Sequence, residues 1–379
     1  MRQPTLVLLE CQPRPSPTGP RVPWLWRHHA GEIAEALSPL ELVQVADAAE
    51  AEEAAWDAAV LGFGRIVAVG GPRVAHGLVN GIMRLTEVHR RRMKVGFLNL
   101  GSPSAWGRTA GLPNALARQL EILAAGHTLP YDIGRVECTD AAGQQVARHF
   151  VLGASCGLLG ASGSELAPAP LRAMRVMAAV LGTMGRTIAG RMPAAVIEVD
   201  GQEVYRGPWA LAMVMGGTHY PVFGHTAPEA NPSDGALDVM WIPAPDALRF
   251  AAYAVALWVR GRIDQVDGMP SPPRCKGTNV RISPLGEASG PGCAIEADGV
   301  PIGRLPATIQ VIPRTFPMIV EAVAARLRER NRVTAEVRGA ALAGGLRRVG
   351  MRRGEIGRLA IDVPRRRVRK LQPWASESR

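Results

Sequence analysis

Aromatic side chains make up only 5% of this 379-residue chain, and cysteine is scarce and scattered. The five cysteines have neither CxxC nor metal-type spacing, which excludes a disulfide framework and gives no sign of a zinc site. An odd, unclustered set is typical of reduced thiols, so we predict a cytoplasmic protein, and none of the five has the setting of a catalytic nucleophile. They are Cys11, Cys138, Cys156, Cys275 and Cys293.

Long hydrophobic runs are also missing. No window reaches the roughly 18 uncharged apolar residues that a membrane span requires, and the best candidate, Phe250–Val259, is too short. The apolar run near the N-terminus is brief and is followed by prolines, which predicts a first strand rather than a secretory signal. Glycine (42) and proline (31) are plentiful, which indicates many turns, and the length allows two domains.

The net charge of +11 is concentrated near the C-terminus. Residues 326–370 hold fifteen Arg or Lys against four Asp or Glu, so the rest of the chain is close to neutral. Such a tail could contact an anionic membrane, which would give a peripheral location at its inner surface. Nucleic acid is a second possible partner, but aromatic residues that would stack on bases are missing from the segment. A solvated, partly disordered tail over residues 331–379 is the third interpretation.

Residues 1–125 alternate between strand-like and helix-like segments. This alternation predicts an α/β domain with a parallel sheet covered on both faces. Ligands in such sheets bind beyond the carboxyl ends of the strands. The predicted strands are Thr5–Glu10, Glu41–Val45, Arg65–Val69 and Lys94–Leu98, and the predicted helices are His28–Leu37, Asp47–Val60 (with Asp47 as N-cap), Val74–His89, Pro103–Ala110 and Asn114–Ala125.

The pattern changes near Gly126. From residue 126 to 313 the segments are short, alternate in hydrophobicity and are separated by Gly, Pro, Asp or Asn, which predicts an antiparallel β-sandwich or barrel. One helical interruption is expected at Leu171–Thr187. Residues 314–330 are predicted to form a helix that returns to the first domain.

The most informative motif follows the third predicted strand, where Gly70 and Gly71 precede a helical pattern. Backbone N–H groups of a tight turn and of a helix N-terminus meet a phosphate in this layout. Pro72 cannot donate because it has no N–H, whereas Arg73 could hold a phosphate bidentately. The alternative is that Pro72 and Arg73 simply begin a structural helix, with proline in its first turn.

Five segments in order resemble the diacylglycerol kinase catalytic-domain superfamily, which includes bacterial lipid kinases, sphingosine kinases and ceramide kinases. VAVGGPRVAHGLVNGIM is similar to VAxGGDGTxxEVxNGL, and VGFLNLGSPSAWGRTAGLP to LGxxPxGTGNDFARxLGxP. HTLPYDIGRV, PSDGALDVMWI and AIEADGVPIGRLPATIQVIP are similar to three segments of the family's second domain. The resemblance implies an ATP- and Mg²⁺-dependent kinase that phosphorylates a lipid hydroxyl, with a β-sandwich after the nucleotide-binding domain.

The resemblance also implies roles for individual residues. Gly70, Gly71 and Arg73 would lie at the ATP phosphates, together with Gly101 and Ser102 of the second motif. In both motifs this chain lacks the family's acidic residue, so activity is expected to be reduced. Two alternatives stay open: a silent pseudokinase that binds lipid or nucleotide, and an interaction protein that binds an anionic partner through its basic tail.

Three carboxylates complete the predicted site. Asp298 corresponds to the residue proposed as general base in bacterial members of the family, and a carboxylate within hydrogen-bond reach can accept the proton of a lipid hydroxyl. The alternative is an Asp-Gly hairpin turn between two strands. Asp234 and Asp238 could bind a hard cation such as Mg²⁺, or could belong to a turn before a strand.

Overall fold

The computed structural model of this chain describes residues 4–11, 24–100, 104–157, 192–221, 224–243, 271–286 and 293–322, together with residues 181, 182, 185 and 189. Three sequence predictions fall outside those residues: most of the helix at Leu171–Thr187, the pair Gly101 and Ser102, and the basic tail. Within the described part of the chain, no helix is long and apolar enough to cross a membrane.

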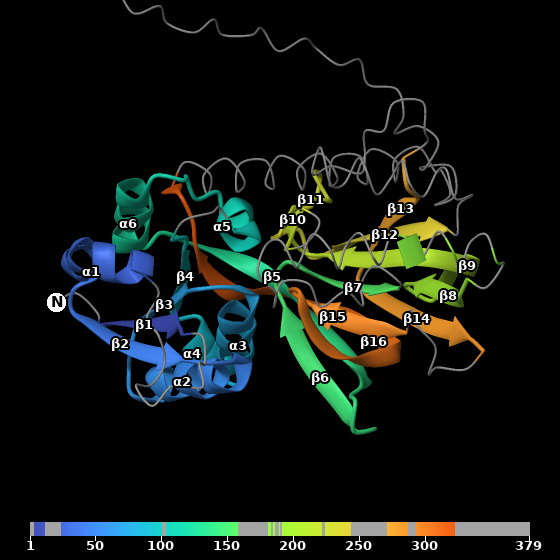
Figure 1. The fold of residues 1–379 in the computed structure, drawn as a ribbon, viewed down its shortest axis with the longest axis horizontal. Helices are drawn as coiled ribbons and strands as arrows, with labels where there is room; N and C mark the ends of the chain where they lie inside the picture. Colours follow the sequence, from blue (N-terminus) through green and yellow to red (C-terminus); the bar gives the residue numbers. More distant parts are fainter. Residues whose placement is uncertain are drawn as a thin grey trace, which may run out of the picture. The chain divides into compact units, whose positions relative to one another are not determined.

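The N-terminal part, which we call the first lobe, is built on a parallel sheet, as its strand–helix alternation predicts (Figure 1). Its strands run in the order β2-β1-β3-β4, and the end of a later strand, β16, lies parallel to β4. Burial on both faces explains why β1 and β3 read as continuous apolar runs. The four strands are β1 (Thr5–Glu10), β2 (Leu40–Val45), β3 (Arg65–Val69) and β4 (Lys94–Leu98).

The helices described in this lobe begin at recognisable signals. Asp47 caps α2, as predicted: its carboxylate accepts from the Glu50 N–H at 2.9 Å, and the Glu50 carboxylate accepts from the Ala46 N–H at 2.8 Å. The predicted single helix Val74–His89 is wrong in its continuity, because an extended Thr86 separates α3, which ends at Met83, from the short helix α4. The helices are α1 (Trp24–Leu37), α2 (Ala48–Val60), α3 (Pro72–Met83), α4 (Glu87–Arg90), α5 (Ala105–Ala110) and α6 (Leu116–Ala125).

The second lobe is the predicted antiparallel β-sandwich. Its hydrogen bonding closes on itself: β9 pairs with β7 and β8, β16 pairs with β15 and β14, and the two groups are joined because β7 pairs with β15 and β8 with β14. The strands are β5 (Thr128–Thr139), β6 (Gln145–Phe150), β7 (Gly153–Gly157), β8 (Ala194–Val199), β9 (Gln202–Met215), β10 (His219–Tyr220), β11 (Gly224–His225), β12 (Leu237–Pro243), β13 (Arg274–Gly277), β14 (Asn279–Leu285), β15 (Ala294–Ala297) and β16 (Val300–Ile319).

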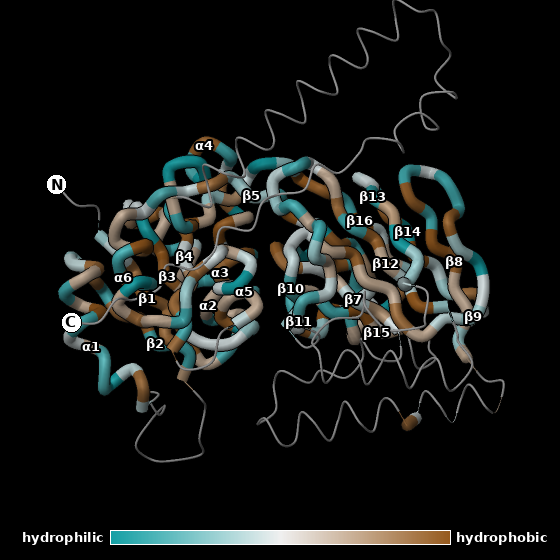
Figure 2. The backbone as a smooth tube through the Cα atoms, turned by 90° about the horizontal axis from the view of Figure 1, so that it is seen from above, coloured by the Kyte–Doolittle hydropathy of each residue, from teal (hydrophilic) through white to brown (hydrophobic). Residues whose placement is uncertain are grey.

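The protein has two hydrophobic cores, and the boundary between them falls within a strand rather than at a loop. Tyr131 and Ile133 of β5 pack into the first core, whereas Val136 of the same strand packs into the second. Figure 2 shows the hydrophobic segments gathered on the inner strands of the first lobe, with hydrophilic stretches on its helices. The boundary that the composition placed at residue 126 therefore lies just before a strand that both lobes share.

The predicted helix over residues 314–330 is wrong for its described part. Residues up to Ile319 belong to β16, which reaches the first lobe as a strand, and Met318 pairs with Val95 of β4. A short, fully apolar run cannot be assigned to helix or strand from periodicity alone. Pro317 within the run opposes a helix, because it lacks the N–H that a helix interior requires.

Helices α2 and α3 approach closely because two glycines on α3 leave room for the α2 backbone. A Cβ atom at Gly81 would lie 2.3 Å from the carbonyl oxygen of Glu52, and one at Gly77 would lie 2.3 Å from that of Ala48. We therefore expect Gly81→Ala to lower the free energy of unfolding by about 1–3 kcal/mol. Urea unfolding measures this effect.

Gly31, within α1, is the matched control for that substitution. A Cβ atom there meets nothing within 4 Å, so Gly31→Ala should raise the free energy of unfolding, by up to about 1 kcal/mol. Equal effects at Gly31 and Gly81 would contradict the close packing of the two helices.

Candidate functional site

Three parallel strands of the first lobe end at one edge of the sheet. β1 ends with Glu10, β3 leads into Gly70, and β4 leads into Asn99. Because β1 pairs with β3 and β3 with β4, all in parallel, these residues emerge on the same side. This is the edge at which open α/β sheets bind their ligands.

The Glu10 carboxylate occupies the diglycine loop. One of its oxygens accepts from the Gly71 N–H at 2.5 Å, and the other accepts from the Arg73 Nε at 3.2 Å. Gly71 is the N-cap of α3 and Pro72 is the first helical residue, as proline at a first turn predicts. The N-terminus of α3 thus binds an anion that the chain itself supplies.

The loop geometry requires glycine at its first position. Gly70 has φ +153°, and a Cβ atom there would lie 2.5 Å from the Cβ of Glu10. The side chains of Glu10 and Arg73 are 15% and 29% exposed, so the ion pair is largely shielded from water. A phosphate oxygen that approached the Gly71 N–H would meet the negative charge of Glu10 first.

The second predicted motif is described from Ser104 onward. The Ser104 hydroxyl donates to Asn99 Oδ1 at 2.5 Å and accepts from the Gly107 N–H at 3.1 Å, so it caps α5. The Asn99 side chain lies against Gly107, where a Cβ atom would be 1.9 Å from its amide nitrogen. Asn99 therefore supplies a half-buried amide group directly after β4, close to the place where the family motif has polar residues.

Asp298, the candidate base, lies at the hairpin turn between β15 and β16. Its carboxylate accepts three backbone N–H groups, from Val151 at 3.1 Å, Leu152 at 2.8 Å and Gly153 at 3.1 Å. Its own N–H donates to the Gly153 carbonyl at 2.8 Å. The side chain is fully buried. We call these three amides the Asp298 cradle.

Burial raises the pKa of Asp298 to about 7, although the three backbone N–H groups of the cradle oppose this shift. A carboxyl group with a pKa near neutral pH is well matched to accept and return a proton. In the described conformation, however, Asp298 has no exposed surface, so a substrate hydroxyl reaches it only if the neighbouring segments move.

The predicted metal ligands share a lysine. The Lys276 Nζ lies 2.8 Å from Asp234 Oδ2 and 3.3 Å from Asp238 Oδ2, so an ammonium group supplies positive charge between the two carboxylates. Among the described residues, no group of three or more His, Cys, Asp and Glu side chains could hold a metal ion. The turn before a strand, which was the alternative, is present: β12 begins at Leu237.

Asp132 is a buried carboxyl group for which the sequence predicted no role. It accepts from the Gly235 N–H and from the Arg314 N–H, each at 2.7 Å, and thereby ties β5 to the Asp234 turn and to β16. Burial raises its pKa to about 6, against the effect of both hydrogen bonds. Its contacts are with the backbone, which indicates a structural role at the junction of the lobes.

These features define a two-lobe protein with an anion-binding loop at the edge of a parallel sheet. The sequence profile described as the diacylglycerol kinase catalytic domain matches residues 19–136, and the one described as the YegS C-terminal NAD kinase beta sandwich-like domain matches residues 172–320. The two matches together span more than half of the chain. The chain belongs to the diacylglycerol kinase catalytic-domain superfamily.

A relative in sequence and a solved structure of similar fold can be named individually. A Pseudomonas putida protein named "Probable lipid kinase YegS-like" is 26% identical over 246 residues, which are 64% of this chain and 78% of that protein. The crystal structure of a diacylglycerol kinase from Bacillus anthracis is similar in fold, with a TM-score of 0.58 and 18% identity. The match covers 85% of this chain and 98% of that one.

Glu10 and Lys276 are the site residues that sequence reasoning missed. Glu10 ends a strand at the same sheet edge as Gly70, and this signal was available once the parallel order of the strands was assumed. No spacing in the sequence connects Lys276 with Asp234, because β13 and the Asp234 turn meet only through pairing of β12 with β13.

Proposed function

We propose that this protein is a lipid kinase that transfers the γ-phosphoryl group of ATP to a lipid hydroxyl, such as that of diacylglycerol or a sphingoid base, at a low basal rate. The observation that carries the proposal is the anion already seated at the N-terminus of α3. The Gly71 N–H and the Arg73 guanidinium hold two carboxylate oxygens of Glu10. A phosphate group offers oxygens to the same donors.

In the proposed reaction, ATP displaces Glu10, and its phosphate oxygens bind to the Gly71 N–H and to Arg73. The lipid hydroxyl oxygen attacks the γ-phosphorus, its proton passes to the Asp298 carboxylate, and the bond from phosphorus to the bridging oxygen breaks to release ADP. Release of Arg73 from Glu10 frees a cation for the phosphates. Mg²⁺ would accompany ATP, but Asp234 and Asp238 already pair with Lys276, so we assign them no step in the reaction.

Two observations favour a second candidate, a silent family member that binds lipid or nucleotide without turnover. Pro72 removes one N–H donor from the loop, and Asp298 is fully buried within its cradle. In either case the basic segment 326–370 is proposed to contact anionic membrane, which would place the protein next to lipid substrates.

Incubation with labelled ATP and vesicles that contain diacylglycerol, sphingosine or ceramide tests the proposal. Formation of labelled phospholipid from one of these acceptors is the expected result. Thermal stabilisation by ATP without labelled product would instead support the silent candidate. If the protein gives no labelled product and is not stabilised by ATP, both the kinase and a silent member that binds nucleotide are contradicted.

A further inference from the structure

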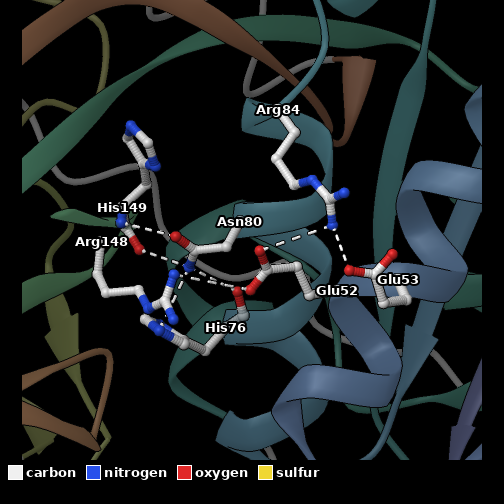
Figure 3. Close-up of polar contacts among 7 residues, drawn as sticks. All are labelled: Glu52, Glu53, His76, Asn80, Arg84, Arg148 and His149. Carbon is white, nitrogen blue, oxygen red and sulfur yellow. Dashed lines mark hydrogen bonds and ion pairs between the residues drawn. The ribbon is translucent and has the colours of Figure 1, made fainter. Parts of the chain in front are cut away.

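The side chain of Asn80 joins the two lobes by pairing with a backbone unit of β6. Its amide oxygen accepts from the His149 N–H at 2.9 Å, and its amide nitrogen donates to the His149 carbonyl at 3.2 Å. The same nitrogen donates to the carbonyl of His76 at 2.9 Å, one helical turn earlier. Figure 3 shows Asn80 between His76 and His149, with its amide facing the strand.

This pairing takes the place of a neighbouring strand. Among the described strands, β6 pairs only with β5, so its other edge is left without a strand partner. Backbone groups that point away from β5 at such an edge need another partner. The Asn80 amide presents an N–H and a C=O to the strand as a peptide group would, and it satisfies both backbone groups of His149 while its nitrogen also donates to the His76 carbonyl.

The position of His149 matters because the Asp298 cradle follows it closely. Phe150 ends β6, and the next three residues, Val151, Leu152 and Gly153, are those whose N–H groups hold the Asp298 carboxylate. At its N-terminus, α3 begins at the Gly71 loop that binds Glu10. One helix therefore connects the proposed phosphate loop to the segment that holds the proposed base.

The ion pair that joins β6 to a helix near Asn80 is weak by comparison, and the short pair of Arg84 with Glu53 joins α3 only to α2. Glu52 of α2 lies 4.0 Å from both Arg84 and Arg148, at the limit of an ion pair, and Arg148 is exposed. Asn80 is 3% exposed, and its hydrogen bonds to the half-buried His149 are partly shielded from water. The specific connection between α3 and β6 is therefore the buried Asn80 amide and not the charged side chains that Figure 3 also shows.

We propose that Asn80 is a positioning residue, which fixes β6 through His149 and thereby sets the place of the Asp298 cradle relative to the phosphate loop. Asn80 touches no reacting atom in this role. The part of the proposal that concerns catalysis rests on the proposed kinase function. The part that concerns the cradle stands on the hydrogen bonds alone.

Hydrogen exchange of the cradle amides tests the proposal without any need for activity. In Asn80→Ala, the amides of residues 151–153 should exchange at least about tenfold faster than in the native protein, because two shielded hydrogen bonds are lost. The control is Val79→Ala, which removes buried side-chain volume from the preceding position of α3 and takes away no hydrogen-bonding group. Its effect on those amides should stay within about twofold once global stability is taken into account.

The kinetic readout separates positioning from simple loss of structure. Asn80→Ala should lower kcat about tenfold and leave the KM for ATP within about twofold, because the Gly71 loop is unchanged. Asn80→Asp retains an acceptor for the His149 N–H, so its kcat should lie between those of the native protein and of Asn80→Ala. Unchanged exchange in the cradle, or equal acceleration in Val79→Ala, would overturn the proposal. A native protein without turnover would refute the kinase function but leave the exchange result to decide on Asn80.

Discussion

Replacing Glu10 by glutamine is expected to lower the Kd for ATP by at least about tenfold, which corresponds to about 1.4 kcal/mol. The carboxylate and a phosphate compete for the Gly71 N–H and for Arg73. Two like charges about 4 Å apart near a protein surface repel by several kcal/mol. Glutamine keeps the size of the side chain and one acceptor oxygen but removes the charge. Titration calorimetry with ATP measures the change.

The matched control for this substitution is Glu41→Gln. Glu41 lies on β2, the strand next to β1, and is exposed. Its replacement changes the net charge by the same amount without any contact with the loop, so the Kd for ATP should change less than about twofold. The double variant Glu10→Gln with Arg73→Met should lose part of the gain. If Glu10→Gln binds ATP no more tightly than the native protein, the self-occupied loop is not the ATP site.

The second large effect is expected at Asp298. Asp298→Asn should reduce lipid phosphorylation at least about a hundredfold, the usual contribution of a general base. It should also lower the free energy of unfolding by about 2 kcal/mol, because an amide NH₂ then faces an N–H donor of the cradle. Steady-state turnover, measured at a temperature where the variant is folded, tests the expected loss of lipid phosphorylation.

Asp132→Asn separates the two effects. Asp132 is also a buried carboxyl that accepts backbone N–H groups, so its replacement should destabilise the fold by the same mechanism. Its turnover should nevertheless stay close to that of the native protein. Equal losses of activity in both variants would mean that Asp298 acts through stability rather than as a base.

The pKa of Asp298 also predicts a pH dependence of stability. Its folded-state pKa is raised from 3.8 to about 7, so the folded protein retains a proton that the unfolded chain releases. The stability that this group contributes is therefore fully present below about pH 4 and is lost as pH rises through about 7. Urea unfolding should show the native protein losing stability relative to Asp298→Asn across this window. The opposite slope would indicate an ionised carboxylate in the cradle.

Much of this fold could be predicted because local signals and tertiary structure agree. The alternation of strand-like and helix-like segments predicts β1 and β3 at the residues where the structure has them, and Asp47 caps α2 as its position indicates. The Asp298-Gly299 dipeptide forms the two-residue hairpin turn that was the alternative to a catalytic role, with φ +52° and +81°. A turn residue and a base can be the same residue, so the two interpretations are compatible.

The site was harder to predict because its partners are distant in the sequence. Glu10 reaches Gly71 across 61 positions, and Asn80 reaches His149 across 69. Such pairs depend on which strands become neighbours, and no spacing rule encodes them. The end of β16 is a further example, because its apolar run forms a strand by pairing with both β4 and β5.

The central claim is that Glu10 and a nucleotide phosphate compete for one anion site at the start of α3. A crystal structure of the native protein with a non-hydrolysable ATP analogue tests it most directly. We predict a phosphate oxygen at the Gly71 N–H, with the Glu10 side chain turned away and Arg73 on the phosphates. An analogue bound elsewhere, with the hydrogen bond between Glu10 and Gly71 intact, would contradict the account.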